Sequence, residues 1–90
     1  MVSEKVTVKN KQGFHLRPAN EFASAMGVFS SEVMLVAGER EVNGKSLMNI
    51  ISAGIRGGTE IEIRCSGEDE KEALETALKL INSCFGEEQI

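Results

Sequence analysis

The apolar residues of this chain follow two different spacings, and the order in which those spacings alternate limits the possible folds. Residues 5–9 alternate polar and apolar side chains, as in a half-buried strand. Between residues 16 and 26 the apolar side chains recur every three or four positions, as along one face of a helix. The two spacings predict strands over residues 5–9, 32–37, 40–42 and 59–65, and helices over residues 16–26, 47–54 and 69–81.

The predicted element order, β-α-β-β-α-β-α, indicates an α+β fold. Strands with one polar face, combined with three amphipathic helices, favour a four-stranded antiparallel sheet that carries all three helices on one face. Ninety residues are enough for one domain of this kind, over residues 1–90, with a modest apolar core.

Residue types at the predicted helix starts support these boundaries. Pro18 falls in the first turn of the first helix, where the N–H that proline lacks has no helical partner. Ser46 precedes the second helix and is suited to the N-cap position. Asp69, with Glu72 three residues later, predicts a capping box at the start of the third helix.

Charge and cysteine content exclude several classes of protein. A net charge of −4 argues against a nucleic-acid-binding protein, whose affinity rests on clustered Lys and Arg. No apolar run is long enough to enter a membrane, and the first residues lack the apolar core of a secretion signal. Cys65 and Cys84 lie far apart, which favours buried reduced thiols over a disulfide or a metal site. We therefore expect a cytoplasmic protein.

The sequence offers no ligand set for a metal and no nucleotide-binding motif. There is one histidine and no cysteine cluster, so no metal or other cofactor is expected. Gly44-Lys45-Ser46 matches only the end of a phosphate-binding P-loop, because the first glycine of that motif is replaced by Glu39.

The single histidine, His15, lies in the stretch Gly13-Phe14-His15-Leu16-Arg17-Pro18-Ala19, at the predicted start of the first helix. A neutral imidazole nitrogen is available as a nucleophile near pH ~7. A phosphoryl group on that ring would meet the unpaired backbone N–H groups of Leu16 and Arg17, and the Arg17 guanidinium. Pro18 fixes φ and so helps to hold this helix start. From the residues alone, an exposed cap histidine without chemistry stays open as an interpretation.

This stretch resembles the active-site signature of HPr, the histidine-containing phosphocarrier of the bacterial sugar phosphotransferase system. Residues 42–48, Val-Asn-Gly-Lys-Ser-Leu-Met, resemble the regulatory-serine region of the same family. Chain length, strand order and the Gly-Gly-Thr-Glu stretch before the last strand are also similar, so the resemblance covers nearly the whole chain. It implies an HPr-like open-faced β-sandwich and a phosphoryl carrier that other proteins act on, not an enzyme with its own turnover.

The resemblance also implies roles for individual residues. By this resemblance, enzyme I, phosphorylated by phosphoenolpyruvate, would pass the group to Nδ1 of His15, and His15 would deliver it to the IIA domains of sugar permeases. Arg17 is implied to stabilise the phosphoryl group. In the low-GC Gram-positive type, an HPr kinase/phosphorylase modifies the serine that corresponds to Ser46, and the catabolite control protein A is a further partner. Phosphate adds about −1.5 to −2 charges, so we expect it to slow transfer through His15, although capping alone explains Ser46.

The second predicted helix is too short to bury all of its apolar residues. We expect Ile50 in the core and Leu47, Met48 and Ile51 as partner contacts, because exposed apolar residues beside an anion site suggest a docking surface. In the family it is the first and second helices that meet the partners.

Three positions depart from the commonest residues of the family. Leu16 stands where Ala or Thr is usual, Asn20 where a small residue is frequent, and Asn49 where Gly is common. None of these changes removes a phosphoryl-transfer group, so we expect Asn20 and Asn49 to contact partners and all three positions to affect partner choice. A monomer is expected.

A regulatory interaction module is the alternative function. Such a module would bind a transcription factor or a metabolic enzyme, with Ser46 as its switch and His15 unused in sugar transport. Loss of the imidazole would be the sequence mark of such a module, and here the imidazole is present.

Overall fold

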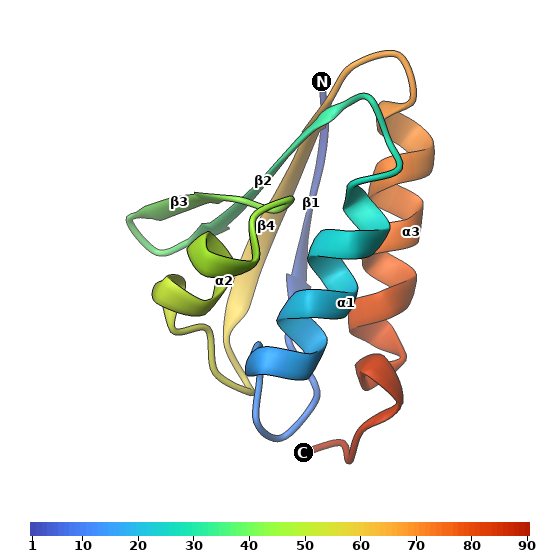
Figure 1. The fold of residues 1–90 in the computed structure, drawn as a ribbon. Helices are drawn as coiled ribbons and strands as arrows, with labels where there is room; N and C mark the ends of the chain where they lie inside the picture. Colours follow the sequence, from blue (N-terminus) through green and yellow to red (C-terminus); the bar gives the residue numbers. More distant parts are fainter.

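A four-stranded antiparallel sheet forms one layer of the structure, a computed structural model that describes residues 1–90 (Figure 1). The strands are β1 (Val2–Thr7), β2 (Glu32–Ala37), β3 (Arg40–Asn43) and β4 (Glu60–Ser66), and their spatial order is β1-β4-β2-β3. Leu35 of β2 lies opposite Val42 on one side and Ile63 on the other. Directly paired residues share a face of a sheet, so this register collects apolar side chains on one face.

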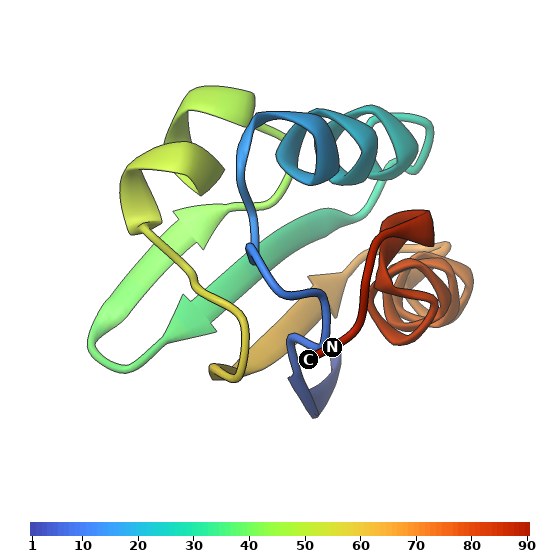
Figure 2. The same ribbon diagram turned by 90° about the horizontal axis from the view of Figure 1, so that it is seen from below.

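Three helices cover that face of the sheet, as Figure 2 shows from below. They are α1 (Leu16–Met26), α2 (Leu47–Ala53) and α3 (Glu70–Asn82), and a 3₁₀ turn, η1 (Cys84–Gly86), follows α3. The predicted α+β order and the open-faced sheet with helices on one side are confirmed. Two details differ: β1 begins and ends earlier than predicted, although Val8 stays buried, and the spacing rules gave no sign of η1.

The core lies between the sheet and the helices. The apolar stripe predicted for α1 is buried in full, and α3 contributes Ala73, Ala77 and Ile81. Cys65 and Cys84 are buried free thiols, as expected from their spacing. None of the helices combines the length and the apolar composition that a membrane span requires.

The antiparallel arrangement of α1 and α3 brings two distant segments together. In Figure 1 the start of α1 and the end of α3 lie at the same end of the molecule. Residues 85–87, which follow α3, therefore lie beside residues 15–17, and Ile90 N donates a hydrogen bond to Lys9 O at 2.9 Å.

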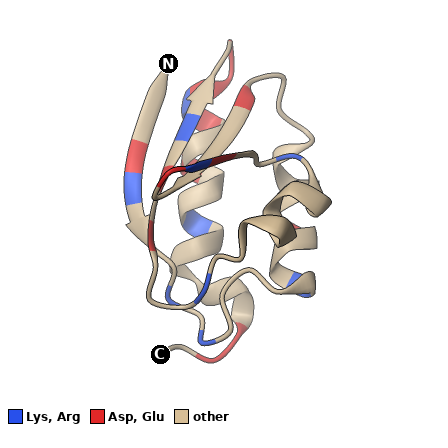
Figure 3. Cartoon of the chain, turned by 90° about the vertical axis from the view of Figure 1, so that its left-hand side faces the viewer, with Lys and Arg blue, Asp and Glu red and all other residues tan.

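Charges of both signs are mixed along the strands (Figure 3). On the sheet, the Arg64 guanidinium lies 3.0 Å from a carboxylate oxygen of Glu62 and 3.5 Å from one of Glu41. Because Arg64 is paired with acidic side chains and charges of both signs are mixed along the strands, the sheet presents no continuous positive surface.

The predicted capping box at α3 is wrong. Asp69 is the N-cap residue, but its side chain makes no capping hydrogen bond to α3. Its carboxylate instead accepts hydrogen bonds from Ser30 N at 2.9 Å and Ser31 N at 3.0 Å. The Asp69 carboxylate binds this loop instead of capping α3, because the loop that follows α1 places the free N–H groups of Ser30 and Ser31 beside it.

Candidate functional site

The start of α1 is the part of the fold with unpaired backbone donors beside an accessible imidazole. His15 is the N-cap residue, with extended backbone angles and no side-chain capping hydrogen bond. The N–H groups of Leu16 and Arg17 make no hydrogen bond within the protein, and the next residue is Pro18, which has none. Two donors at the positive end of the helix dipole are therefore free to bind an anion.

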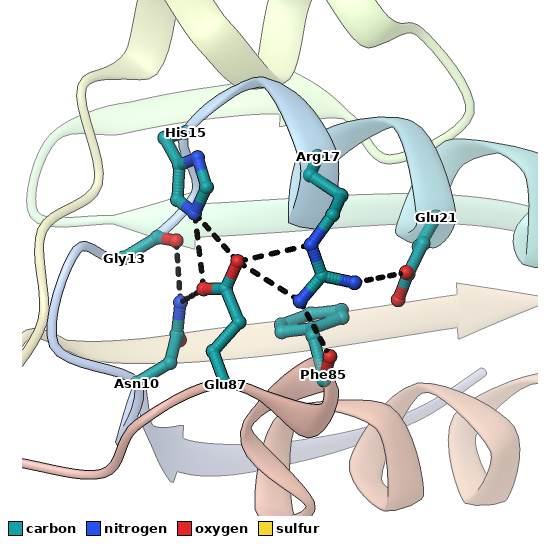
Figure 4. Close-up of polar contacts among 7 residues, drawn as sticks. All are labelled: Asn10, Gly13, His15, Arg17, Glu21, Phe85 and Glu87. Atoms are coloured by element: carbon teal, nitrogen blue, oxygen red, sulfur yellow. Dashed lines mark hydrogen bonds and ion pairs between the residues drawn. The ribbon is translucent and has the colours of Figure 1, made fainter.

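The His15 ring is partly accessible and is held from one side. Its side chain is 36% exposed, so a second protein can reach it. Nε2 lies 2.8 Å and 3.0 Å from the two carboxylate oxygens of Glu87. Nδ1 makes no hydrogen bond with the protein, and in Figure 4 it lies on the far side of the ring from Glu87.

The guanidinium of Arg17 contacts the same carboxylate. Its Nε and Nη2 lie 3.2 Å and 3.0 Å from Oε2 of Glu87, while Nη1 donates to Oε1 of Glu21 at 2.6 Å (Figure 4). Nη2 also donates to the backbone oxygen of Phe85 at 2.9 Å. His15 and Arg17, which the sequence predicted to act together, are thus joined through a residue that the sequence analysis did not identify.

Glu87 carries a full negative charge at neutral pH. Burial of its carboxylate opposes ionisation, but hydrogen bonds from His15, Asn10 and Arg17 outweigh that effect and lower the pKa of Glu87 below its ordinary value. The side chain is 18% exposed, so solvent weakens these interactions only in part.

Asn10 supports both the loop before His15 and the Glu87 carboxylate. The Asn10 side chain is fully buried, and its Nδ2 donates to Gly13 O at 2.6 Å and to Glu87 Oε1 at 3.0 Å. Its Oδ1 is buried without a partner. Leaving a buried polar atom unpaired costs free energy. The two hydrogen bonds of Nδ2 offset that cost and hold the amide in place.

Packing fixes the position of residues 85–87. The Phe85 ring meets the Phe14 ring edge to face at 5.4 Å, and Phe14 meets Phe22 in the same way at 5.5 Å. Phe85 is 4% exposed, so the segment that carries Glu87 is anchored in the core. Aromatic pairs of this geometry contribute about 0.5–1.5 kcal/mol beyond the area they bury.

The turn before His15 is set by close approach to the residues after α2. Phe14 N donates to Ile55 O at 3.0 Å, and Gly13 adopts a φ of +66°. A Cβ at Gly13 would lie 2.4 Å from Ile55 O, so only glycine fits there.

Ser46 caps a different helix. Its Oγ accepts a hydrogen bond from Asn49 N at 3.3 Å, as the sequence predicted, and Gly54 ends α2 in the left-handed conformation. Ser46 is therefore not part of the cluster around His15.

The residues predicted to contact partners lie on α1 and α2, which pack beside each other. Ile50 is fully buried, as predicted, while Leu47 is only half-buried and packs against the core. The others are exposed: Met48 at 72%, Ile51 at 38%, Asn20 and Asn49. Leu16, which was expected to affect partner choice, is also exposed, at 64%.

Glu87, Asn10 and Phe85 were not predicted from the sequence. Nothing in the sequence next to any of the three marks it, because their role depends on the end of α3 reaching the start of α1. No group of three or more His, Cys, Asp or Glu side chains is arranged to hold a metal ion.

Over most of its length the chain is similar to known proteins. The family model described as "PTS HPr component phosphorylation site" matches residues 2–83. The phosphocarrier protein HPr of Neisseria meningitidis is 38% identical over 87 residues, which cover 97% of this chain and 98% of that protein. The HPr-like protein Crh of Bacillus subtilis is 43% identical over 75 residues, which cover 83% of this chain and 88% of that protein.

Solved structures of similar proteins have the same fold. A crystal structure of HPr from Thermoanaerobacter tengcongensis superposes with a TM-score of 0.94 at 39% identity, over 98% of this chain and 99% of that chain. A second crystal structure from that organism is described as an HPr dimer, with a TM-score of 0.78 at 38% identity, over 97% of this chain and all of that chain.

Proposed function

Because the chain belongs to the HPr family of phosphocarrier proteins, we propose that His15 accepts a phosphoryl group from one protein of the sugar phosphotransferase system and passes it to another. The membership confirms the resemblance that the two sequence motifs indicated. A carrier of this kind is a substrate of phosphotransferases and does not turn over a metabolite itself.

The uncapped start of α1 is the observation that supports His15 as the acceptor. The partly exposed imidazole lies beside two free backbone N–H groups, those of Leu16 and Arg17. These donors and the helix dipole stabilise a bound anion by roughly 0.3–1 kcal/mol at an exposed site. Modest stabilisation suits a carrier, because the phosphoryl group must leave again.

Arg17 contributes a cation that is close to the acceptor yet half exposed. A guanidinium gives charge-assisted hydrogen bonds to phosphoryl oxygens. Its present ionic partners are the carboxylates of Glu21 and Glu87, so Arg17 gives up part of these contacts when it binds the phosphoryl group. Pro18 is buried and lends the helix start its fixed backbone angle.

Family membership supports enzyme I as the donor and the IIA domains of sugar permeases as acceptors. Five exposed side chains on α1 and α2, together with the half-buried Leu47, supply a docking surface for them; the exposed ones are Leu16, Asn20, Met48, Asn49 and Ile51. Exposed apolar residues around a transfer site let different partners pack against one surface. A Met48→Asp variant is expected to slow transfer from enzyme I without loss of the fold.

Ser46 is proposed as a second, regulatory phosphorylation site, with HPr kinase/phosphorylase as the modifying enzyme and the catabolite control protein A as a partner of the modified form. Ser46 immediately precedes Leu47 and Met48 of the docking surface. A phosphate there adds about −1.5 to −2 charges beside an apolar contact, which disfavours docking of acidic partners. Equal rates of phosphorylation by enzyme I for the modified and unmodified protein would rule this regulation out.

A regulatory module is the second candidate, and the similarity to Crh favours it. Crh of Bacillus subtilis is described as a catabolite repression HPr, and it is 43% identical to this chain. In this alternative the protein acts by binding, with Ser46 as the switch. The proposed monomer is tested alongside by light scattering, since similar structures of both HPr and Crh are described as dimers.

Incubation with phosphoenolpyruvate and enzyme I tests the carrier function directly. We expect a mass gain of one phosphate that is lost after an acid wash and is absent in His15→Ala, because a phosphoramidate is acid-labile. ATP with the serine kinase is expected to give an acid-stable adduct that is absent in Ser46→Ala. A protein that gains only the acid-stable phosphate fits the regulatory module instead.

A further inference from the structure

Glu87 contacts the imidazole of His15. It is not the proposed phosphoryl acceptor, and its negative charge does not suit it to bind a phosphoryl group. We propose that Glu87 is a positioning residue: its carboxylate holds the His15 ring through Nε2, which keeps the proton on that nitrogen and the lone pair on Nδ1. This inference rests on the proposed function of His15 as the phosphoryl acceptor.

The direction of the hydrogen bond follows from the charge of Glu87. An ionised carboxylate has no proton to donate, so the contacts of 2.8 Å and 3.0 Å require that Nε2 of His15 donate. A neutral imidazole carries one N–H, which places the lone pair on Nδ1. That nitrogen has no hydrogen bond to the protein and lies away from Glu87 (Figure 4), so it is free to attack.

The same contact stabilises the charge that forms during transfer. The lone pair of Nδ1 forms the bond to phosphorus, while the bond between phosphorus and the donor atom breaks and its electron pair leaves with the donor. No proton is lost in this step, so Nε2 keeps its hydrogen and the ring becomes a phosphorylated imidazolium. The Glu87 carboxylate then accepts a hydrogen bond from a cation, which is stronger than one from a neutral ring.

The position of this carboxylate is set by the surrounding fold. Asn10 binds Oε1 from the buried side, Arg17 binds Oε2 from α1, and the Phe85 ring anchors the segment. The other charged groups nearby are Glu21, which pairs with Arg17, and Lys11 and Glu88, which line an open cavity of about 220 Å³ with Gln12 and Glu87. None of these three makes a hydrogen bond to the imidazole.

Glu88 provides a matched control. It is the next residue, it carries the same charge, and its side chain is exposed. Its backbone oxygen, which accepts a hydrogen bond from Lys11 N at 2.9 Å, is unchanged in Glu88→Ala. Glu87→Ala and Glu88→Ala therefore alter the net charge equally, and only the first removes the contact to the ring.

The experiment reads the tautomer and the transfer rate in the intact protein. Nitrogen-15 NMR at pH ~8.5, where imidazole is ordinarily neutral, reports which ring nitrogen carries the proton. We expect the Nε2–H form alone in the wild type and in Glu88→Ala. Glu87→Ala is expected to shift toward the tautomer mixture of a free histidine side chain, and Glu87→Asp to recover part of the difference. The rate constant for phosphorylation by enzyme I falls roughly tenfold in Glu87→Ala only.

Three outcomes overturn the positioning role. These are an unchanged tautomer in Glu87→Ala, an unchanged rate of phosphorylation in that variant, and a higher rate of phosphorylation. A higher rate would mean that Glu87 mainly competes with the phosphoryl group for Arg17. If the wild type gains no acid-labile phosphate at all, the carrier function fails, while the NMR arm still decides whether Glu87 fixes the ring.

Discussion

The starts of α1 and α2 are held in place by different kinds of contact. Ser46 caps α2 with its own side chain, which accepts the N–H of Asn49 three residues later. His15 occupies the corresponding position of α1, but its ring turns to Glu87, 72 residues away in the sequence. The N–H groups that a local cap would bind are therefore left free at α1.

The difference shows how a helix start can serve an external anion. A side-chain cap satisfies the N-terminal donors and also occupies them. A start that is fixed by contacts from elsewhere keeps the donors available, but it depends on distant parts of the chain. At α1 these distant contacts are Glu87 on the imidazole and Ile55 on the turn at Gly13.

His15→Ser turns the α1 start into a copy of the α2 start, and it gives the largest expected effect. The acid-labile phosphate is lost completely, because serine cannot form a phosphoramidate. The free energy of unfolding changes by less than about 1 kcal/mol, since the gain of a capping hydroxyl offsets the lost contact to Glu87. Mass measurement after reaction with enzyme I, paired with urea unfolding, checks both parts. An acid-labile phosphate that survives the substitution would contradict His15 as the acceptor.

Gly13→Ala disturbs the long-range contacts that hold α1, and it is expected to cost about 2–5 kcal/mol of unfolding free energy. Part of this cost is the positive φ, and part is the approach of the new Cβ to Ile55 O. Gly38→Ala is the control: its φ of +62° is similar, but a Cβ there meets nothing within 4 Å. It should cost only about 1–2 kcal/mol. Equal losses in urea unfolding would show that the contact with Ile55 is unimportant.

The same contrast explains which features the sequence could predict. The apolar stripe of α1, the Ser46 cap and the burial of Ile50 depend on neighbours within one turn, and all three predictions are confirmed. The clustering of His15 with Arg17 follows from their adjacency. Glu87 and Asn10 could not be found, because their contacts exist only once α3 packs antiparallel to α1.

Ser46→Ala removes the local cap and is expected to lower the free energy of unfolding by about 1 kcal/mol. The control is Ser52→Ala on the same helix, where the hydroxyl donates to Asn49 O and caps no N–H. Ser52→Ala should change stability by less than half as much, and neither variant should alter the acid-labile phosphate on His15. Loss of that phosphate in Ser46→Ala would mean that the two helix starts are coupled.

The start of α3 combines features of the α1 and α2 starts. Its N-cap residue, Asp69, has a hydrogen-bonding side chain like Ser46, but that side chain contacts a distant loop, as His15 does. The pKa of Asp69 is lowered from 3.8 to about 2, chiefly by the Ser31 hydroxyl and then by the N–H of Ser30. Because the folded state depresses this pKa, the contact stabilises the protein fully above pH 3.8 and loses its effect as the pH falls toward 2.

Asp69→Asn is therefore expected to be less stable than the wild type at neutral pH, and the gap in melting temperature should close between about pH 4 and pH 2. Glu72→Ala, which removes the partner that the sequence predicted for a capping box, should leave this pH profile unchanged, because the Asp69 carboxylate binds Ser30 and Ser31 instead. If the dependence of melting temperature on pH flattens in Glu72→Ala, a local cap of the kind found at α2 would also hold the start of α3. A profile that persists in Glu72→Ala and disappears in Asp69→Asn places α3 with α1, among the helix starts that depend on distant residues.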